Sequence, residues 1–161
     1  MDFSRFFDYE QVKSDSLARQ ELAFLISADK ADWEKLVAHC VRVPFHAGDI
    51  VLKQGDRTQA LFIVAKGELE VIQEGDRHGP KSLALIPSGS VFGEQAFFDG
   101  APRSASVRAL ADGEVLELTA SEFDVLAAHD PRLARSILFD LGRILSLRLR
   151  ETTQLMHGAT D

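Results

Sequence analysis

The spacing of apolar residues divides the chain into three zones. Residues 1–41 carry apolar side chains at helical spacing over 16–27 and over about 29–37, which predicts two helices. Over 42–119 the apolar stretches become short and are separated by turn residues, which is typical of β-strands. Helical spacing returns over 120–156. A chain of 161 residues has the usual size of one domain, so we expect the three zones to fold together.

The middle zone predicts eight short strands, as in a β-sandwich or a small barrel. Its apolar stretches are rich in Val, Ile, Leu and Phe, which suit a half-buried pleated surface. The breaks hold Gly, Pro, Asp and Ser, which favour turns. The predicted strands cover residues 42–46, 50–53, 60–65, 68–73, 82–86, 90–93, 104–109 and 114–119.

The third zone begins with two start signals for helices. Thr119 and Glu122 have the spacing of a capping box, which predicts a short helix. Asp130 as N-cap and Pro131 at the first helical position predict a second helix, which runs to about Thr152.

The second of these helices has a wide apolar face. Ala134, Leu138, Leu141, Leu145 and Leu149 follow one another at steps of four or three residues. One side of this face is expected to pack on the strands. The other side is left for a partner, which makes the helix over 131–151 a candidate homodimer interface, with plain core packing as the alternative. Gly142 in mid-helix is either a hinge or the site of a close helix contact.

Charge and composition exclude several classes of protein. The net charge of −7, from 18 basic and 25 acidic residues, argues against binding to DNA or to an anionic membrane. The longest apolar run, 60–65, is far shorter than the ~20 residues that span a bilayer. The single cysteine, Cys40, cannot form an internal disulfide, and no signal peptide is visible. We therefore expect a soluble cytoplasmic protein, without room after its last helix for a helix-turn-helix domain.

The segment 92–106 combines residue types that suit a phosphorylated sugar. If residues 94–98 form a helical turn, its first N–H groups are unpaired and attract an anion. Gly93 lets a ligand approach the backbone, and the Arg103 guanidinium can bind two phosphate oxygens. Glu94 is an acceptor that suits a sugar hydroxyl. Together these groups match the needs of a nucleotide monophosphate.

Two other interpretations of the sequence are a surface salt bridge and an enzyme. Glu94 and Arg103 also fit a surface salt bridge across a hairpin, which contributes only ~0–1 kcal/mol. An enzyme is not expected, because neither a nucleophile–base motif nor a paired set of metal-binding histidines is present. The histidines are scattered at His39, His46, His78, His129 and His157, and no metal site is predicted.

The segment 92–106 resembles the phosphate-binding cassette of the cyclic nucleotide-binding domains, the family of the catabolite activator and protein kinase A regulatory subunit type. The family pattern Phe-Gly-Glu-(apolar)-Ala followed by Arg-(Ser/Thr/Ala)-Ala is matched by Phe92-Gly93-Glu94-Gln95-Ala96 and Arg103-Ser104-Ala105. Stretches over 45–56 and 61–71 resemble the opening strands of the family, and the resemblance covers about residues 20–150. It implies a mainly β fold, an eight-stranded jelly-roll (double-stranded β-helix) with N-terminal helices and C-terminal lid helices.

The resemblance also implies roles for individual residues. Glu94 and the Gly93 backbone would hold the ribose 2′-hydroxyl, and Arg103 would pair with the cyclic phosphate. Backbone amides of the cassette would complete the phosphate contacts. The residues implied for the nucleotide are Gly93, Glu94, Gln95, Ala96, Arg103 and Ser104, and those that could cover the base from the last helix are Ile144, Arg148 and Leu149.

Two positions depart from the family pattern. Gln95 stands where the family usually has an apolar residue, so its side chain needs a polar partner or solvent. Gln59 stands where many members have an Asp that relays the state of the cassette arginine. The function implied is a sensor or regulatory module for cAMP, or less favourably cGMP, that signals to an effector protein through its last helix. The alternative is a degenerate domain that keeps the fold for protein interaction and binds no nucleotide.

Overall fold

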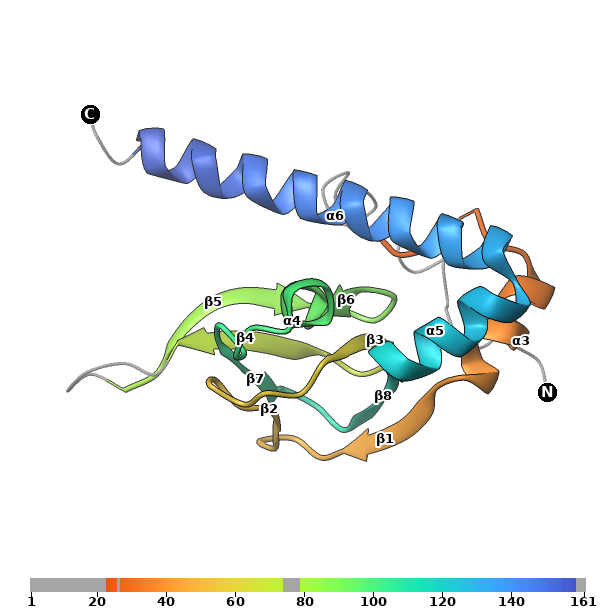
Figure 1. The fold of residues 1–161 in the computed structure, drawn as a ribbon. Helices are drawn as coiled ribbons and strands as arrows, with labels where there is room; N and C mark the ends of the chain where they lie inside the picture. Colours follow the sequence, from red (N-terminus) through yellow and green to blue (C-terminus); the bar gives the residue numbers. More distant parts are fainter. Residues whose placement is uncertain (1–22, 26, 74–78, 159–161) are drawn as a thin grey trace.

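Two four-stranded antiparallel sheets and a set of helices make up the structure, a computed structural model that describes residues 23–25, 27–73 and 79–158 (Figure 1). The first sheet has the strand order β1-β8-β3-β6 and the second has the order β2-β7-β4-β5. The strands are β1 (Val41–Phe45), β2 (Ile50–Leu52), β3 (Ala60–Lys66), β4 (Leu69–Gln73), β5 (Lys81–Ile86), β6 (Val91–Phe92), β7 (Ser106–Ala109) and β8 (Gly113–Thr119). The helices are α3 (Lys30–Ala38), α4 (Glu94–Asp99), α5 (Ala120–His129) and α6 (Pro131–Gly158).

The first sheet lies between the second sheet and the helices, so its strand β3 is buried on both faces. In β3, Leu61 and Ile63 pack with the helices, whereas Phe62 and Val64 pack against the second sheet. Burial on both faces explains why this strand is a continuous apolar run. The expected fold class is confirmed: the chain is a mainly β jelly-roll with flanking helices.

All eight predicted strands are present in the described residues and agree closely with the predicted ranges. The largest difference is at β7, which was predicted from residue 104 and begins at Ser106. Ser104 and Ala105 instead form a bend, and the Ser104 hydroxyl donates to the side chain of Gln95. The bend leaves these residues next to α4 rather than in the sheet.

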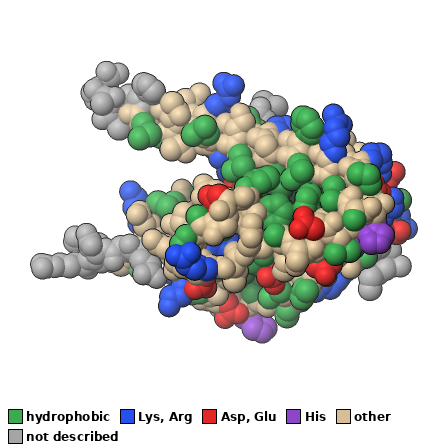
Figure 2. All heavy atoms as spheres, in the orientation of Figure 1, with side chains coloured by type: hydrophobic (Ala, Val, Ile, Leu, Met, Phe, Trp, Pro, Cys, Tyr) green, Lys and Arg blue, Asp and Glu red, His purple; other side chains and the backbone are tan. Residues whose placement is uncertain are grey.

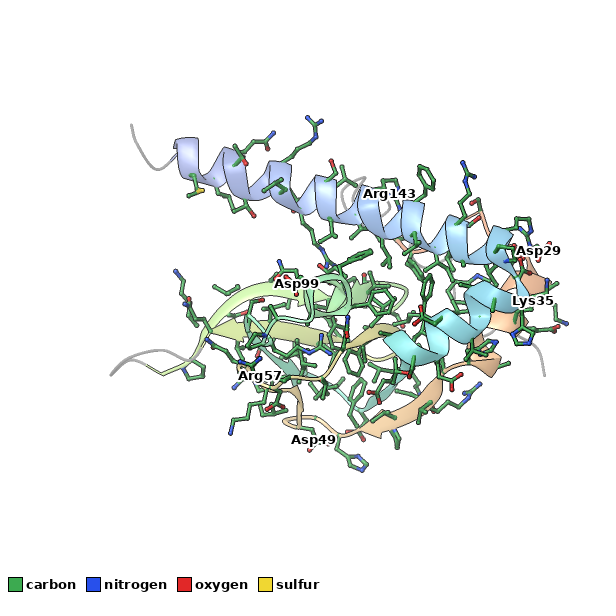
Figure 3. All side chains as sticks on the ribbon, in the orientation of Figure 1. Asp29, Lys35, Asp49, Arg57, Asp99 and Arg143 are labelled. Carbon is green, nitrogen blue, oxygen red and sulfur yellow. The ribbon has the colours of Figure 1, made fainter. Side chains whose placement is uncertain are left out.

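The N-caps predicted at Thr119 and Asp130 are present, and Asp29 also caps α3. The side chains of Asp29, Thr119 and Asp130 accept hydrogen bonds from backbone N–H groups in the first turn of α3, α5 and α6. Lys35 donates to Asp130 at 2.6 Å, which joins α3 to the start of α6, at the corner where Figure 3 labels Asp29 and Lys35. These caps satisfy donors that would otherwise be unpaired.

The helix predicted over 16–27 is wrong for its last residues, and its earlier part lies outside the described residues. Residues 23–25 are irregular, with Leu25 at φ +51°. The Leu25 N–H donates to Asp140 of α6 at 2.6 Å, and the Phe24 N–H donates to Gly89 O at 3.2 Å. These distant partners replace the bonds to the preceding turn that a helix would need.

Helix α6 extends beyond the predicted end at about Thr152 and is 28 residues long. Its first half packs on the body of the molecule, whereas its last part stands clear of the sandwich (Figures 1 and 2). The fully or nearly buried residues are Leu133, Ala134, Ile137, Leu141 and Ile144, and the exposed apolar residues are Leu138, Phe139, Leu149, Leu155 and Met156. None of the helices in the described ranges is long and apolar enough to cross a membrane.

We predict that Gly142→Ala stabilises the protein by ~0.5–1 kcal/mol, because Ala has the higher helix propensity. A Cβ at Gly142 meets no atom within 4 Å in the described chain, so no close contact within this chain requires the glycine. Denaturant unfolding at low protein concentration measures the gain. A loss of stability would contradict the prediction.

Candidate functional site

Helix α4 is a short helix between β6 and β7, with one glycine directly before it and one directly after it. Gly93 before it has φ +77° and Gly100 after it has φ +65°, both in the left-handed region that favours glycine. Figure 3 labels Asp99, the last residue of α4, in the part of the molecule below α6. By helix geometry, the first N–H groups of α4 lack partners within the helix.

Gly93 is required by close packing as well as by its backbone angle. A Cβ on Gly93 would lie 2.8 Å from Nη1 of Arg103, 3.1 Å from Cδ2 of Phe62 and 3.2 Å from the carbonyl oxygen of Ala60. Contacts under 3.0 Å force a neighbour to move. Any side chain at residue 93 would therefore displace the Arg103 guanidinium.

Arg103 is 3% exposed and is held by the chain itself. Its Nη1 donates to Gly93 O at 2.8 Å, and its Nη2 donates to Ala60 O at 2.9 Å. Its Nε and Nη2 donate to Thr58 Oγ1 at 3.2 and 3.1 Å. A guanidinium has five N–H donors, so these four hydrogen bonds leave one donor, on Nη1, within the described part of the chain.

The charge of Arg103 is balanced by acidic groups at longer range. Burial lowers the pKa of Arg103, while the charges of Glu117, Glu94 and Asp56 act in the opposite direction. The guanidinium carbon also lies 5.4 Å from the ring centre of Phe62, a cation–π geometry. The surroundings thus hold a buried cation beside the N-terminus of α4.

The turn before β3 fixes the backbone of the cassette. Arg103 N–H donates to Asp56 O, and Gly55 N–H donates to Arg103 O, both at 2.9 Å. Thr58, in the same turn, binds the guanidinium. Sequence reasoning missed Thr58, because no motif marks a threonine that becomes a neighbour of Arg103 only when β2, β3 and β7 pack together.

Glu94 and Arg103 do not form the surface salt bridge that was weighed as an alternative. Glu94 is 5% exposed, and its Oε1 accepts from Nη1 of Arg148 at 2.5 Å. The other amino group of Arg148 donates to Val91 O at 2.7 Å. The carboxylate expected to hold a ribose is therefore joined to α6.

The two departures from the family pattern both find partners in the structure. The Gln95 side-chain oxygen accepts from the Ser104 hydroxyl at 3.0 Å. The Gln59 side-chain nitrogen donates to Phe97 O at 3.0 Å. Gln59 therefore binds the C-terminal half of α4 and does not bind Arg103. These two side-chain hydrogen bonds hold the cassette together in addition to its backbone hydrogen bonds.

The three residues expected to cover a base lie in different environments. Ile144 is fully buried in the core, Arg148 reaches Glu94, and Leu149 is 67% exposed. Strand β5, below the last part of α6 in Figure 1, carries the exposed side chains of Leu83 and Leu85. Figure 2 shows open space between this part of α6 and the sandwich.

Within the ranges that the structure describes, no group of three or more His, Cys, Asp and Glu side chains is arranged to hold a metal ion. His39 pairs with Glu122 at 3.2 Å, and His129 contacts Val125 O in its own helix at 2.8 Å. His78 lies outside the described residues.

Burial raises the pKa of Cys40 to about 12, so its thiol is protonated near neutral pH.

Comparison with known proteins identifies relatives of this chain. The chain is 34% identical over 125 residues to the cAMP-activated global transcriptional regulator Vfr of Pseudomonas aeruginosa, a match that covers 75% of this chain and 56% of Vfr. It is 35% identical over 104 residues to the cyclic AMP receptor protein of Thermus thermophilus, covering 65% of this chain and 46% of that protein. The chain thus spans about half the length of these curated relatives.

Comparison with solved structures finds proteins of the same kind as these sequence relatives. The catabolite activator protein of Thermus thermophilus superposes with a TM-score of 0.72 at 27% identity, covering 84% of this chain and 62% of the other. The family described as the cyclic nucleotide-binding domain matches residues 42–130, which is more than half of the chain and runs from the second residue of β1 to beyond β8. The chain belongs to the cyclic nucleotide-binding domain family.

Proposed function

We propose that this chain binds a cyclic nucleotide, with cAMP preferred over cGMP, and acts as a sensor or regulatory module. The observation that carries the proposal is the cluster of Gly93 with the buried side chains of Glu94 and Arg103 around the start of α4, in which Arg103 Nη1 lies 2.8 Å from Gly93 O. The preference for cAMP is supported by the two curated relatives, both named for cAMP.

The phosphate would bind where Arg103 meets the first amides of α4. The remaining Nη1 donor of Arg103 and the N–H groups of Gln95 and Ala96 supply positive partial charge for an anion. Because Arg103 is 3% exposed, the phosphate has to draw the guanidinium away from part of its bonding to Thr58. The backbone N–H of Ser104 would also donate to the phosphate. The Ser104 hydroxyl would do so after it breaks its hydrogen bond to the Gln95 side chain.

The ribose and base would extend from the phosphate toward α6. Glu94 is the acceptor for the ribose 2′-hydroxyl, since an ionised carboxylate only accepts hydrogen bonds. The base would lie in the space between β5 and the last part of α6, where Leu83, Leu85 and Leu149 expose apolar surface. These three side chains offer faces on which a purine can pack.

Helix α6 is the element through which we propose that binding is reported. Its exposed residues Leu138 and Leu149 form part of an apolar strip, which supports a homodimer through the helix over 131–151 or contact with an effector protein. A ligand changes this surface only through its different affinity for two positions of α6. Sedimentation of the protein with and without cAMP measures the effect on self-association.

A thermal-shift panel of cAMP, cGMP, 5′-AMP and inorganic phosphate tests the ligand class. At one hundred times its dissociation constant, a ligand stabilises the folded state by ~2.7 kcal/mol. We expect a clear rise in melting temperature with cAMP, a smaller rise with cGMP, and none with 5′-AMP or phosphate. No shift with either cyclic nucleotide at millimolar concentration would favour the degenerate interaction module.

A further inference from the structure

Gln95 and Ser104 form a hydrogen bond between the two ends of the cassette. The Ser104 hydroxyl donates to Oε1 of Gln95 at 3.0 Å, and the two residues are 9 positions apart in the chain. Gln95 is the second residue of α4, whereas Ser104 lies in the bend that follows Arg103. Both residues are exposed, so a ligand that approaches the cassette can reach this hydrogen bond.

The bond to Gln95 uses the proton that the Ser104 hydroxyl has to donate. A serine hydroxyl carries one O–H donor, and its remaining capacity is for accepting hydrogen bonds. The oxygens of an ionised phosphodiester accept hydrogen bonds and donate none. The hydroxyl can therefore donate either to Gln95 or to a phosphate beside Arg103, but not to both.

The residue type at position 95 decides whether this competition exists. Gln95 departs from the family pattern, which usually has an apolar residue at this position. An apolar side chain would leave the Ser104 hydroxyl to water until a ligand arrives. The Gln95 side chain instead offers an acceptor that α4 already holds in place. Its bond to Ser104 stabilises the unliganded cassette and is lost when the hydroxyl turns to a phosphate.

We propose that Gln95 limits the nucleotide affinity of the site by holding the Ser104 hydroxyl away from the phosphate. This inference rests on the proposed function. Gln95 is a positioning residue in this account, because it acts on the ligand through Ser104. Affinity falls with the fraction of molecules in which the hydroxyl is free, so the restraint makes the sensor respond at a higher nucleotide concentration.

The test is a calorimetric titration of the wild type, Gln95→Met, Ser104→Ala and the double variant with cAMP. Met is unbranched like Gln and has a similar helix propensity, but its thioether is only a weak acceptor. We expect Gln95→Met to bind cAMP about two- to tenfold more tightly, the effect of one ordinary hydrogen bond. Ser104→Ala should bind more weakly than the wild type, since it loses a bond to a charged group. Adding Gln95→Met to Ser104→Ala should then change nothing further.

Gln73→Met is the matched control for the substitution itself. Gln73 is an exposed glutamine at the end of β4, outside the cassette. The same change at this position should leave the affinity for cAMP as it is in the wild type. A gain equal to that of Gln95→Met would show that the effect does not depend on Ser104 and would contradict the inference.

The sign of the change at Gln95 separates two roles of its side chain. Weaker cAMP binding by Gln95→Met would make Gln95 a direct ligand, through side-chain N–H groups that have no hydrogen-bond partner in the described part of the chain. Unchanged binding, or a gain that persists beside Ser104→Ala, would also overturn the inference. If the wild type binds cAMP, these outcomes affect the inference alone. If neither the wild type nor Gln95→Met binds cAMP, the proposed function fails together with it.

Thermal unfolding without nucleotide tests whether the hydrogen bond is present in solution. The wild type, Gln95→Met, Ser104→Ala and the double variant are compared. One shared hydrogen bond predicts that the double variant melts close to the less stable single variant, because the second change removes nothing more. If the two decreases in melting temperature instead add, the bond is not formed in the unliganded protein and the inference is wrong.

Discussion

Arg103→Ala is expected to weaken cAMP binding on the order of 10- to 150-fold, the equivalent of ~1.5–3 kcal/mol for a hydrogen bond to a charged group. The substitution removes the cation that lies against the Gly93 carbonyl at the start of α4. It also removes the guanidinium donor to the Ala60 carbonyl oxygen and one of two donors to the Gly93 carbonyl oxygen, which keeps the N–H of Phe97. Isothermal titration of the variant with cAMP, beside the wild type, measures the loss.

Two variants separate the loss of the phosphate contact from a loss of folding. Arg103→Lys keeps the charge but not the forked geometry, so we expect intermediate affinity with a fold close to that of the wild type. Arg57→Ala removes an exposed arginine from the turn before β3 (Figure 3) and should leave the affinity unchanged. Binding of cAMP by a folded Arg103→Ala protein at wild-type strength would contradict the assigned phosphate contact.

Gly93→Ala is expected to reduce both stability and cAMP affinity. The left-handed backbone costs a non-glycine residue ~1–2 kcal/mol, and the new Cβ would lie 2.8 Å from Nη1 of Arg103. Because Phe62 and the Ala60 carbonyl also crowd this position, the guanidinium has to leave its site. Denaturant unfolding and calorimetric titration measure the two effects.

Gly100→Ala is the matched control for this prediction. Gly100 has φ +65° at the other end of α4, but the nearest atom to a Cβ there is 3.9 Å away, on Gln59. The control therefore carries the backbone strain without the close contacts. We expect it to lose stability and to keep its affinity for cAMP. Equal losses of affinity in the two variants would show that strain in α4, and not displacement of Arg103, decides binding.

The strands could be predicted because their signals are local. Glycine and proline turns separate the apolar stretches, and β3 is apolar throughout because both of its faces are covered. The caps at Thr119 and Asp130 are likewise local, since each side chain bonds to a backbone N–H three residues later. The helix predicted over 16–27 fails at Leu25, where a hydrogen bond to Asp140 replaces local helical bonding.

The cassette itself could be identified from its motif, but its contacts could not. The pattern locates Gly93, Glu94 and Arg103 without showing that Arg103 is buried or that Thr58 binds it. The pair of Glu94 and Arg148 joins residues 54 positions apart. That distance is bridged only when Ile144 and the preceding buried residues of α6 pack on the first sheet, which is a tertiary effect.

The most direct test of the account is a calorimetric titration of the full chain with cAMP, after unfolding and refolding to remove any ligand carried through purification. We predict a dissociation constant in the micromolar range or below, equivalent to ~8 kcal/mol or more. Absence of binding heat at millimolar cAMP, with a protein that melts cooperatively, would contradict the claim that the cassette around Arg103 binds a cyclic nucleotide.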